Sequence, residues 1–182
     1  MRVIAGTARS LRLKTPSGMD TRPTTDRIKE TLFNMLQPSI PGAIFVDLYS
    51  GSGGIGIEAL SRGADHAYFV ENNRNAIDCI TENLQFTKFT DRATLLKTDV
   101  LSALHGIHEK EADIVFMDPP YDCGHEREVL RILKDAPYVT ERTQIVIEAS
   151  LACDFSYLDR LGFEIDKEKC YKTNKHVFCH KK

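Results

Sequence analysis

Four short apolar runs constrain the fold of this 182-residue chain more than any other feature. They are IFVDLY (44–49), AYFVE (67–71), DIVFMD (113–118) and QIVIEA (144–149). Each is too short for a buried helix and rich in β-branched or aromatic residues. Their apolarity is continuous rather than alternating, as strands buried on both faces require. ATLLKTD (93–99) is a weaker fifth candidate strand.

Helical patterns separate these runs. In residues 75–86 the apolar side chains recur at helical spacing, and they are Ala76, Ile77, Ile80 and Leu84. Residues 125–136 repeat the pattern with Val129, Leu130 and Leu133. Because strand and helix alternate, we expect an α/β fold whose mostly parallel sheet is covered on both faces.

The two ends of the chain lie outside this alternation. Residues 162–182 are typical of two strands around Thr173-Asn174, which predicts a terminal antiparallel hairpin. Near the N-terminus, VIAG (3–6) and LRLKTP (11–16) are predicted to pair as a small hairpin. We therefore expect a basic arm and helix, residues 1–42, attached to a domain formed by residues 43–182.

The helix of the N-terminal extension is predicted within TRPTTDRIKETLFNML (21–36). Pro23 is placed near its start, and Thr24, Thr25 and Asp26 are all candidate N-caps. The predicted apolar stripe consists of Ile28, Leu32, Met35 and Leu36.

Composition narrows the class of protein. Hydrophobic residues make up 42% and charged residues 27%, which is typical of soluble globular chains. No apolar run reaches the length of a membrane span, and MRVIAGTARS has no signal-peptide core. The five cysteines are odd in number and form no CxxC pair, which favours reduced thiols. We expect a cytoplasmic protein without a bound metal or an obligate protein partner.

Charge is unevenly distributed along the chain. Residues 1–42 hold seven Lys or Arg against three Asp or Glu, and residues 169–182 hold five Lys and no acid. The middle of the chain, 43–168, holds twelve basic against twenty-three acidic residues. Basic ends are able to bind a polyanion, although a solvated tail and hairpin would have the same composition.

A glycine-rich loop follows the first predicted strand. Gly51, Gly53 and Gly56 match G-x-G-x-x-G between a strand and a helix, the context that a nucleotide-binding loop requires. Glu71 ends the second strand twenty residues after Gly51, where a carboxylate can accept both hydroxyls of a ribose.

Two classes of cofactor share this layout. A dinucleotide places its pyrophosphate at the helix N-terminus, whereas S-adenosylmethionine (AdoMet) has no phosphate there. Asp47 directly precedes the loop, and its carboxylate would repel a pyrophosphate but suit a cationic ligand. We therefore favour AdoMet. Asp99 is a candidate acceptor for the adenine amino group, or an N-cap of the next helix.

The stretch VFMDPPYDCG (115–124) ends another strand at the same edge of the predicted sheet. Asp118 offers a carboxylate, Pro119 offers a carbonyl that Pro120 holds rigidly, and Tyr121 offers a flat ring. Together they suit a planar base with an exocyclic amino group. Acceptors on both N–H bonds would favour a pyramidal nitrogen whose lone pair can attack a methyl group.

These motifs resemble those of a known family of enzymes. DPPY matches the [DNS]-P-P-[YF] motif of AdoMet-dependent methyltransferases that act on amino groups of nucleic-acid bases. RVIAGTARSLRL (2–13), the segment 21–36, DLYSGSGGIGIEALSRGA (47–64) and VFMDPPY (115–121) resemble the RsmD family. Its members are bacterial 16S rRNA (guanine-966-N2)-methyltransferases. The resemblance extends to about residue 149, and only YSGSGG departs from the expected FAGSGA.

The resemblance implies a Rossmann-like class I methyltransferase fold with seven strands and AdoMet as cofactor. It implies 16S rRNA as partner, within an assembling small ribosomal subunit, and the target guanine at Asp118, Pro119, Pro120 and Tyr121. Cofactor contacts are expected from Asp47, Tyr49, Gly51, Ser52, Gly53, Gly56, Glu71, Asn72, Asp99 and Val100. RNA contacts are expected from Arg2, Arg9, Arg12, Lys14, Arg22, Thr24 and Arg27. Arg22, Pro23 and Thr24 are expected beside the active site.

Three other functions share parts of this pattern. An adenine-N6 methyltransferase on DNA or RNA would use the same DPPY chemistry. An NAD-dependent oxidoreductase would use the glycine loop, and a non-catalytic RNA-binding protein would retain only the fold and the basic arm.

Overall fold

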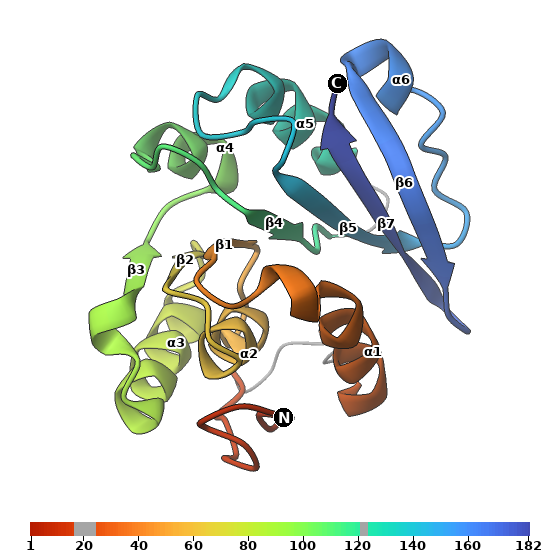
Figure 1. The fold of residues 1–182 in the computed structure, drawn as a ribbon. Coiled ribbons are helices and arrows are strands. Elements are labelled where there is room, and N and C mark those ends of the chain that lie inside the picture. The colour runs from red at the N-terminus through yellow and green to blue at the C-terminus, as the bar shows by residue number, and fades with distance from the viewer. Residues whose placement is uncertain (17–24, 121–123) are drawn as a thin grey trace.

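Seven strands form one sheet in the order β3-β2-β1-β4-β5-β7-β6 (Figure 1). The computed structural model describes residues 1–16, 25–120 and 124–182. The strands are β1 Ile44–Leu48, β2 His66–Val70, β3 Ala93–Leu96, β4 Ile114–Met117, β5 Gln144–Ser150, β6 Phe163–Cys170 and β7 Asn174–Lys181. All five predicted strands are present, and Tyr49, Glu71 and Asp118 lie just beyond the strands they were predicted to end.

The first five strands are parallel, and the predicted terminal hairpin is confirmed. β7 pairs antiparallel with β5 on one side and with β6 on the other. β6 is the outer strand, and seven of its eight residues are exposed. A register shift interrupts its pairing between Ile165 and Lys167.

Helices cover both faces of the sheet (Figure 1). One face carries α1 Asp26–Leu36, α2 Gly54–Ser61 and α3 Arg74–Thr87, and the other carries α4 Val100–Ala103, α5 His125–Asp135 and α6 Leu158–Leu161. Short 3-10 turns follow α1, α3 and α4 at Gln37–Ser39, Thr90–Arg92 and Leu104–Gly106. Because successive strand residues point to opposite faces, each face has its own apolar core.

The N-terminal arm doubles back on itself as predicted, although only the pair Arg2 and Arg12 forms a β-bridge. The Val3 amide donates to the Leu11 carbonyl at 3.0 Å, and the Ser10 amide donates to the Val3 carbonyl at 2.9 Å. The arm packs onto α2, where the Thr7 amide donates to the Ser61 carbonyl at 2.9 Å. The arm is therefore part of the core on the α1 face.

Helix α1 begins after Thr25, whose hydroxyl accepts from the Ile28 amide. Its buried residues are Lys29, Leu32, Phe33 and Leu36. Ile28 and Met35, which we predicted to lie in the stripe, are only half-buried. The apolar face is rotated toward Phe33, and a lysine occupies one of its core positions.

A buried ionic cluster explains this lysine. Lys29 Nζ lies 3.4 Å from Glu58 Oε2, and Arg62 Nε donates to Glu58 Oε1 at 2.8 Å. The amides of Ile4 and Ala5 donate to the same carboxylate at 2.8 and 3.0 Å, while Lys29 Nζ donates to the Arg2 carbonyl at 2.5 Å. Burial lowers the pKa of Lys29, although Glu58 opposes this. Glu58 therefore joins α1, α2 and the arm.

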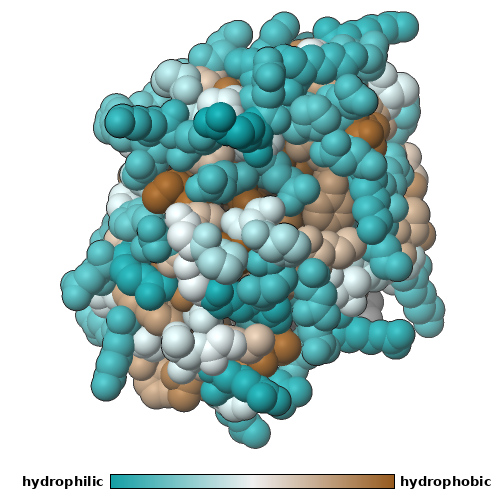
Figure 2. All heavy atoms as spheres, viewed as in Figure 1, coloured by the Kyte–Doolittle hydropathy of each residue, from teal (hydrophilic) through white to brown (hydrophobic). Residues whose placement is uncertain are grey.

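Within the described residues, no helix is both long enough and apolar enough to span a bilayer. Figure 2 shows one face of the molecule, which is mostly hydrophilic, with small apolar areas separated by polar side chains. Where the structure describes the chain, the large exposed apolar residues lie on three separate segments, and they are Phe86, Leu151 and Ile165. Scattered apolar residues of this kind are normal on a protein surface.

We predict that Lys29→Met lowers the free energy of unfolding by about 3 kcal/mol, because it leaves buried Glu58 with one cation fewer. Urea unfolding followed by circular dichroism measures this change. Lys97→Met, at an exposed position, is the matched control and should have little effect. Equal stability of the two variants would show that the buried cluster does not hold the arm and α1 in place.

Candidate active site

The two motif-bearing loops meet at the centre of the sheet. After β1 the chain forms β2 and β3 on one side, and it then returns to β4 on the other side of β1. Loops at such a switch point diverge beyond the carboxyl ends of the strands and leave a crevice for a ligand. The glycine loop follows β1, and Asp118-Pro119-Pro120 follows β4, so both flank this point (Figure 1).

The glycine loop is a tight turn between β1 and α2. Ser50 fixes it to the sheet, because its amide donates to the Val70 carbonyl and its hydroxyl accepts from the Val70 amide. The hydroxyl also donates to the Asp47 carbonyl at 2.6 Å. Tyr49 has a φ of 63°, which is uncommon for a residue with a side chain.

Each glycine of the motif has a separate role. A Cβ on Gly51 would meet no atom within 4 Å, so open space lies beside the loop there. Gly53, with a φ of 78°, is the N-cap of α2. A Cβ on Gly56 would lie 2.4 Å from Phe69 Cε1, so only glycine lets α2 pack this closely on β2.

Asp47 lies beneath the loop and is 1% exposed. Its Oδ2 accepts from the Gly56 amide at 2.9 Å. Burial raises its pKa to about 7, the hydrogen bond from Gly56 opposes this, and the charge of Glu71 adds to it.

Glu71 orders the loop from the other side. Its Oε2 accepts from the Gly51 amide at 2.8 Å, and its Oε1 accepts from the amides of Asn72 and Asn73. Oε2 accepts only one of these hydrogen bonds and has a second lone pair, so the half-buried side chain can still accept from a ligand hydroxyl.

The other predicted cofactor residues surround these. Asp99 is the N-cap of α4, since its Oδ1 accepts from the Ser102 amide at 2.9 Å, as one of our two alternatives proposed. Val100 is buried, and Asn72 is exposed. The Ser52 carbonyl accepts from Asn83 Nδ2, and Asn83 also exchanges two hydrogen bonds with the backbone of Lys14. The arm is thus attached to the loop.

Asp118 lies one residue beyond β4. Phe116 pairs with Asp47 across β1 and β4, so Asp47, Phe116 and Asp118 point to the same face. Burial, then Glu148, then Asp47 raise the pKa of Asp118 to about 8. Pro119 is buried and Pro120 is exposed, while Tyr121 lies outside the described residues.

Glu148 is a further buried carboxyl group beside Asp118, and it was not predicted from the sequence. It is 4% exposed and lies on β5 next to the end of β4. His176 Nε2 lies 3.0 Å from its Oε2, and Asn174 Nδ2 donates to its Oε1 at 2.5 Å. An acid within the apolar run QIVIEA is the same signal that identified Asp47 and Asp118.

The predicted RNA residues differ in their surroundings. Arg9, Arg12 and Arg27 are exposed. Arg2 is also exposed, but its Nε pairs with Asp26 at 2.7 Å, and Lys14 pairs with Glu82. Arg22, Pro23 and Thr24 lie outside the described residues, so their placement stays a prediction.

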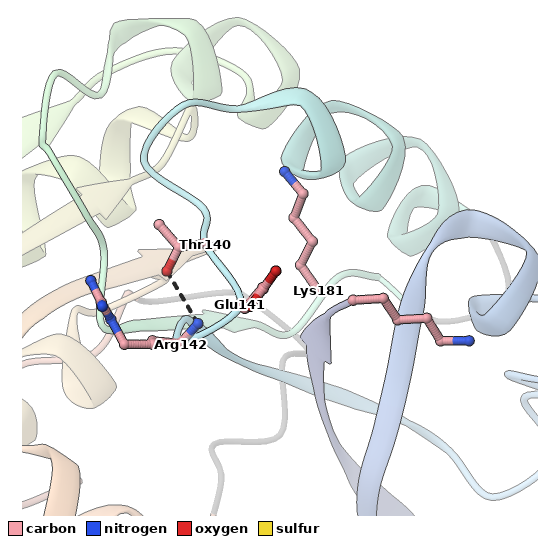
Figure 3. A pocket seen from close by; sticks show the side chains of 5 residues that line it. Thr140, Glu141, Arg142 and Lys181 are labelled. Carbon is pink, nitrogen blue, oxygen red and sulfur yellow. Dashed lines mark hydrogen bonds between the residues drawn. The ribbon is translucent and has the colours of Figure 1, made fainter.

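Two hollows on the surface have no residue of the glycine loop in their lining. One, of about 320 Å³, is lined by residues 140–142 and 181–182 at the amino end of β5, opposite the candidate site (Figure 3). There Thr140 accepts from the Arg142 amide at 3.1 Å. The other, of about 460 Å³, lies between the start of α5 and residues 154–160. Its Arg127 stacks over the Tyr157 ring at 4.4 Å.

No cluster of three or more His, Cys, Asp or Glu side chains in the described part of the chain has the geometry of a metal site. The candidate site therefore consists of a backbone loop with open space at Gly51, and of carboxyl groups beside it.

Comparison with known proteins identifies the family. The family model "Conserved hypothetical protein 95" matches residues 1–179. The chain is 39% identical over 150 residues to YlbH of Bacillus subtilis, covering 81% of this chain and 82% of that one. It is 35% identical over 151 residues to the "Ribosomal RNA small subunit methyltransferase D" of Escherichia coli, covering 83% and 75% of the two chains.

A solved structure supports the same assignment. The Escherichia coli protein yhhF superposes with a TM-score of 0.84 at 30% identity, over 100% of this chain and 98% of that one. The sheet order and the loops at the switch point are those of the Rossmann-like methyltransferase fold. On the family model, the sequence relatives and the fold together, the chain belongs to the RsmD family.

Proposed function

We propose that the protein transfers a methyl group from AdoMet to the exocyclic N2 amine of a guanine in 16S rRNA of the small ribosomal subunit. One observation carries this proposal: the glycine loop and the Asp118-Pro119 acceptors flank the same switch point of the sheet. A cofactor on one loop and an amino group on the other would then lie next to each other. Proximity and alignment of this kind supply much of the rate of a transfer reaction.

The residues around the loop fit AdoMet. When bound, AdoMet supplies a methyl group on a positively charged sulfonium. Asp47 is a carboxyl group whose pKa is raised in the free protein to about 7. A nearby cation favours its ionised form, so it would bind the positive charge of AdoMet. Glu71 Oε2 would accept a hydrogen bond from a ribose hydroxyl, next to the open space at Gly51.

The acceptors at the end of β4 fit an amino group. The Asp118 carboxylate and the Pro119 carbonyl would accept hydrogen bonds from its two N–H groups. They would stabilise positive charge that develops on the nitrogen. Tyr121 would stack on the base. The guanine must leave any stack to reach these groups, as in other enzymes that modify bases.

The substrate is supported by the family and by the arm. The Escherichia coli relative is named as a ribosomal RNA small subunit methyltransferase, and guanine N2 follows from the family resemblance. The exposed side chains of Arg9, Arg12 and Arg27 would contact phosphates. We propose that arm and helix, residues 1–42, bind RNA, that residues 43–182 carry the chemistry, and that the protein acts on assembling subunits in the cytoplasm.

We predict that the dissociation constant of AdoMet falls as pH rises from 6 to 8. Below its pKa of about 7 Asp47 holds a proton, which binding of a cation must release, and above this pKa the cost disappears. Isothermal titration calorimetry in buffers of different ionisation enthalpy measures both the affinity and the protons released. S-adenosylhomocysteine, which lacks the sulfonium charge, is the control and should depend less on pH. Equal pH dependence of the two ligands would contradict this electrostatic role.

We predict that Asp118→Ala abolishes methyl transfer and leaves AdoMet binding within about threefold of wild type, since catalysis depends on interactions made in the transition state. Mapping of modified nucleotides in small-subunit rRNA, with and without this gene, tests the proposed function directly. Naked 16S rRNA and partly assembled subunits are then methylated in vitro.

A methyl label on adenine N6 would show that the target is adenine and not guanine. Thermal stabilisation by NAD but not by AdoMet would refute the methyltransferase assignment, and RNA binding without any transfer would indicate a non-catalytic protein.

We predict that the double reversal Arg9→Glu with Arg12→Glu weakens rRNA binding and lowers its dependence on salt, because phosphate contacts are lost. AdoMet binding should be unchanged. Filter binding at several salt concentrations measures the effect. The control reverses two charges of α5 on the other face of the sheet, Arg131→Glu with Lys134→Glu. If the control weakened binding as much, the arm would not be the RNA-binding surface.

A further inference from the structure

Buried polar side chains continue from Asp118 into the terminal hairpin. Glu148 is 4% exposed, Asn174 is 5% exposed, and His176 is fully buried. They come from β5 and β7, which are neighbours in the sheet, and Glu148 pairs directly with His176. Tyr171, in the turn between β6 and β7, completes the group, and its hydroxyl lies 3.2 Å from His176 Nδ1.

The register places this group on the same face as Asp118. Met117 pairs with Ile147, so Asp118 and Glu148 are the next residues along two adjacent parallel strands. Glu148 and Asp118 therefore point the same way, toward the face that α1 covers. Phe116 and His176 confirm this placement, since their rings meet edge to face with centroids 6.3 Å apart.

Hydrogen bonds hold the Glu148 side chain at both of its oxygens. The His176 ring lies between Glu148 and Tyr171, with Nε2 3.0 Å from Glu148 Oε2 and Nδ1 3.2 Å from the Tyr171 hydroxyl. The Asn174 amide donates to Glu148 Oε1 at 2.5 Å. The carboxyl group is therefore fixed in orientation at the strand position beside Asp118.

No Lys or Arg side chain of the described residues pairs with Glu148. Its ion-pair partner among these residues is His176, whose Nε2 lies 3.0 Å from Glu148 Oε2. A buried carboxylate of this kind is a costly way to hold two strands together, because apolar residues of similar volume do so at least as well. Its charge acts instead on the Asp118 carboxyl group, which follows at the adjacent strand position and whose pKa it raises.

We propose that Glu148 is a positioning residue of the methyl-transfer site, and that it keeps the Asp118 carboxyl group strongly basic while His176 and Asn174 hold Glu148 in place. The inference rests on the proposed function, because it assigns Asp118 the proton of the guanine amine. In that step the N2 nitrogen bonds to the methyl carbon as the carbon–sulfur bond breaks, and the bonding pair stays on sulfur. One N–H proton passes to the Asp118 carboxylate, which leaves methylated guanine and S-adenosylhomocysteine.

A proton acceptor works best when its pKa is close to the working pH. The titratable groups that raise the pKa of Asp118 are Glu148 on β5 and Asp47 on β1, and those facing Glu148 are His176 and Tyr171 of the terminal hairpin. Removal of the Glu148 charge lowers the pKa of Asp118. Asp118 is then ionised in a larger fraction of the molecules at low pH, but each Asp118 carboxylate is a weaker base.

Glu148→Gln tests this directly, because the amide keeps the size of the side chain. Carbon-13 NMR of aspartate carboxyl groups in the full chain, with Asp118→Asn for assignment, gives the titration midpoint of Asp118 without any catalysis. We expect a midpoint near 8 in the wild-type protein and a lower one in Glu148→Gln. Single-turnover methylation should be faster than wild type at pH 6 and about tenfold slower at pH 9, so that the two pH profiles cross.

Two further variants keep the test decisive. Glu164→Gln, on the exposed outer strand β6, is the matched control and should leave both readouts unchanged. Tyr171→Phe removes the hydrogen bond at His176 Nδ1, which loosens the support of Glu148. It should shift the midpoint in the same direction but less, even if Glu148→Gln does not fold. An active wild-type protein whose Asp118 midpoint and pH profile are unmoved by both substitutions would overturn the inference. A wild-type protein that transfers no methyl group to rRNA guanine would overturn the proposed function, and the NMR titration would still test the coupling of the two carboxyl groups.

Discussion

The hydrogen bond from the Gly56 amide to the Asp47 carboxylate fixes the geometry on which the candidate site depends. The first amides of a helix have no partner within the helix, and Gly53, the N-cap of α2, has no side chain to satisfy them. Asp47 supplies the missing acceptor from the end of β1, at 2.9 Å. Its carboxyl group also lies at the positive end of the helix dipole. Strand, glycine loop and helix are thereby held in one arrangement.

Two more buried polar contacts extend this arrangement to the N-terminal arm. Glu58, on α2, binds the amides of Ile4 and Ala5 together with Lys29 of α1. Asn83, on α3, binds both the backbone of Lys14 and the Ser52 carbonyl of the glycine loop. The arm and the loop therefore share their supports, and a change that detaches the arm should also disturb the loop.

Much of this organisation was predictable from local sequence, because continuous apolar runs and helical stripes depend on the residues themselves. The glycine motif, Glu71 and Asp118 were found because each follows a recognisable strand. Lys29 and Glu148 were missed because both lie within apolar patterns, and each has a role only through partners distant in sequence. For Lys29 the partner is Glu58 on another helix, and for Glu148 the partners are Asn174 and His176 on β7. Pairings between distant elements are set by tertiary packing, which a single sequence does not display.

The outer strand β6 forms one of the two edges of the open sheet. An exposed edge strand offers unpaired backbone groups to any other chain that can extend the sheet. Along β6 the exposed side chains include Glu164, Asp166, Lys167 and Glu168, and the register shift after Ile165 interrupts the regular ladder. Charges and irregularities of this kind disfavour pairing between edges. The two strands of the terminal hairpin thus have different roles. The inner strand buries His176, and the outer strand protects the protein from aggregation through the edge of the sheet.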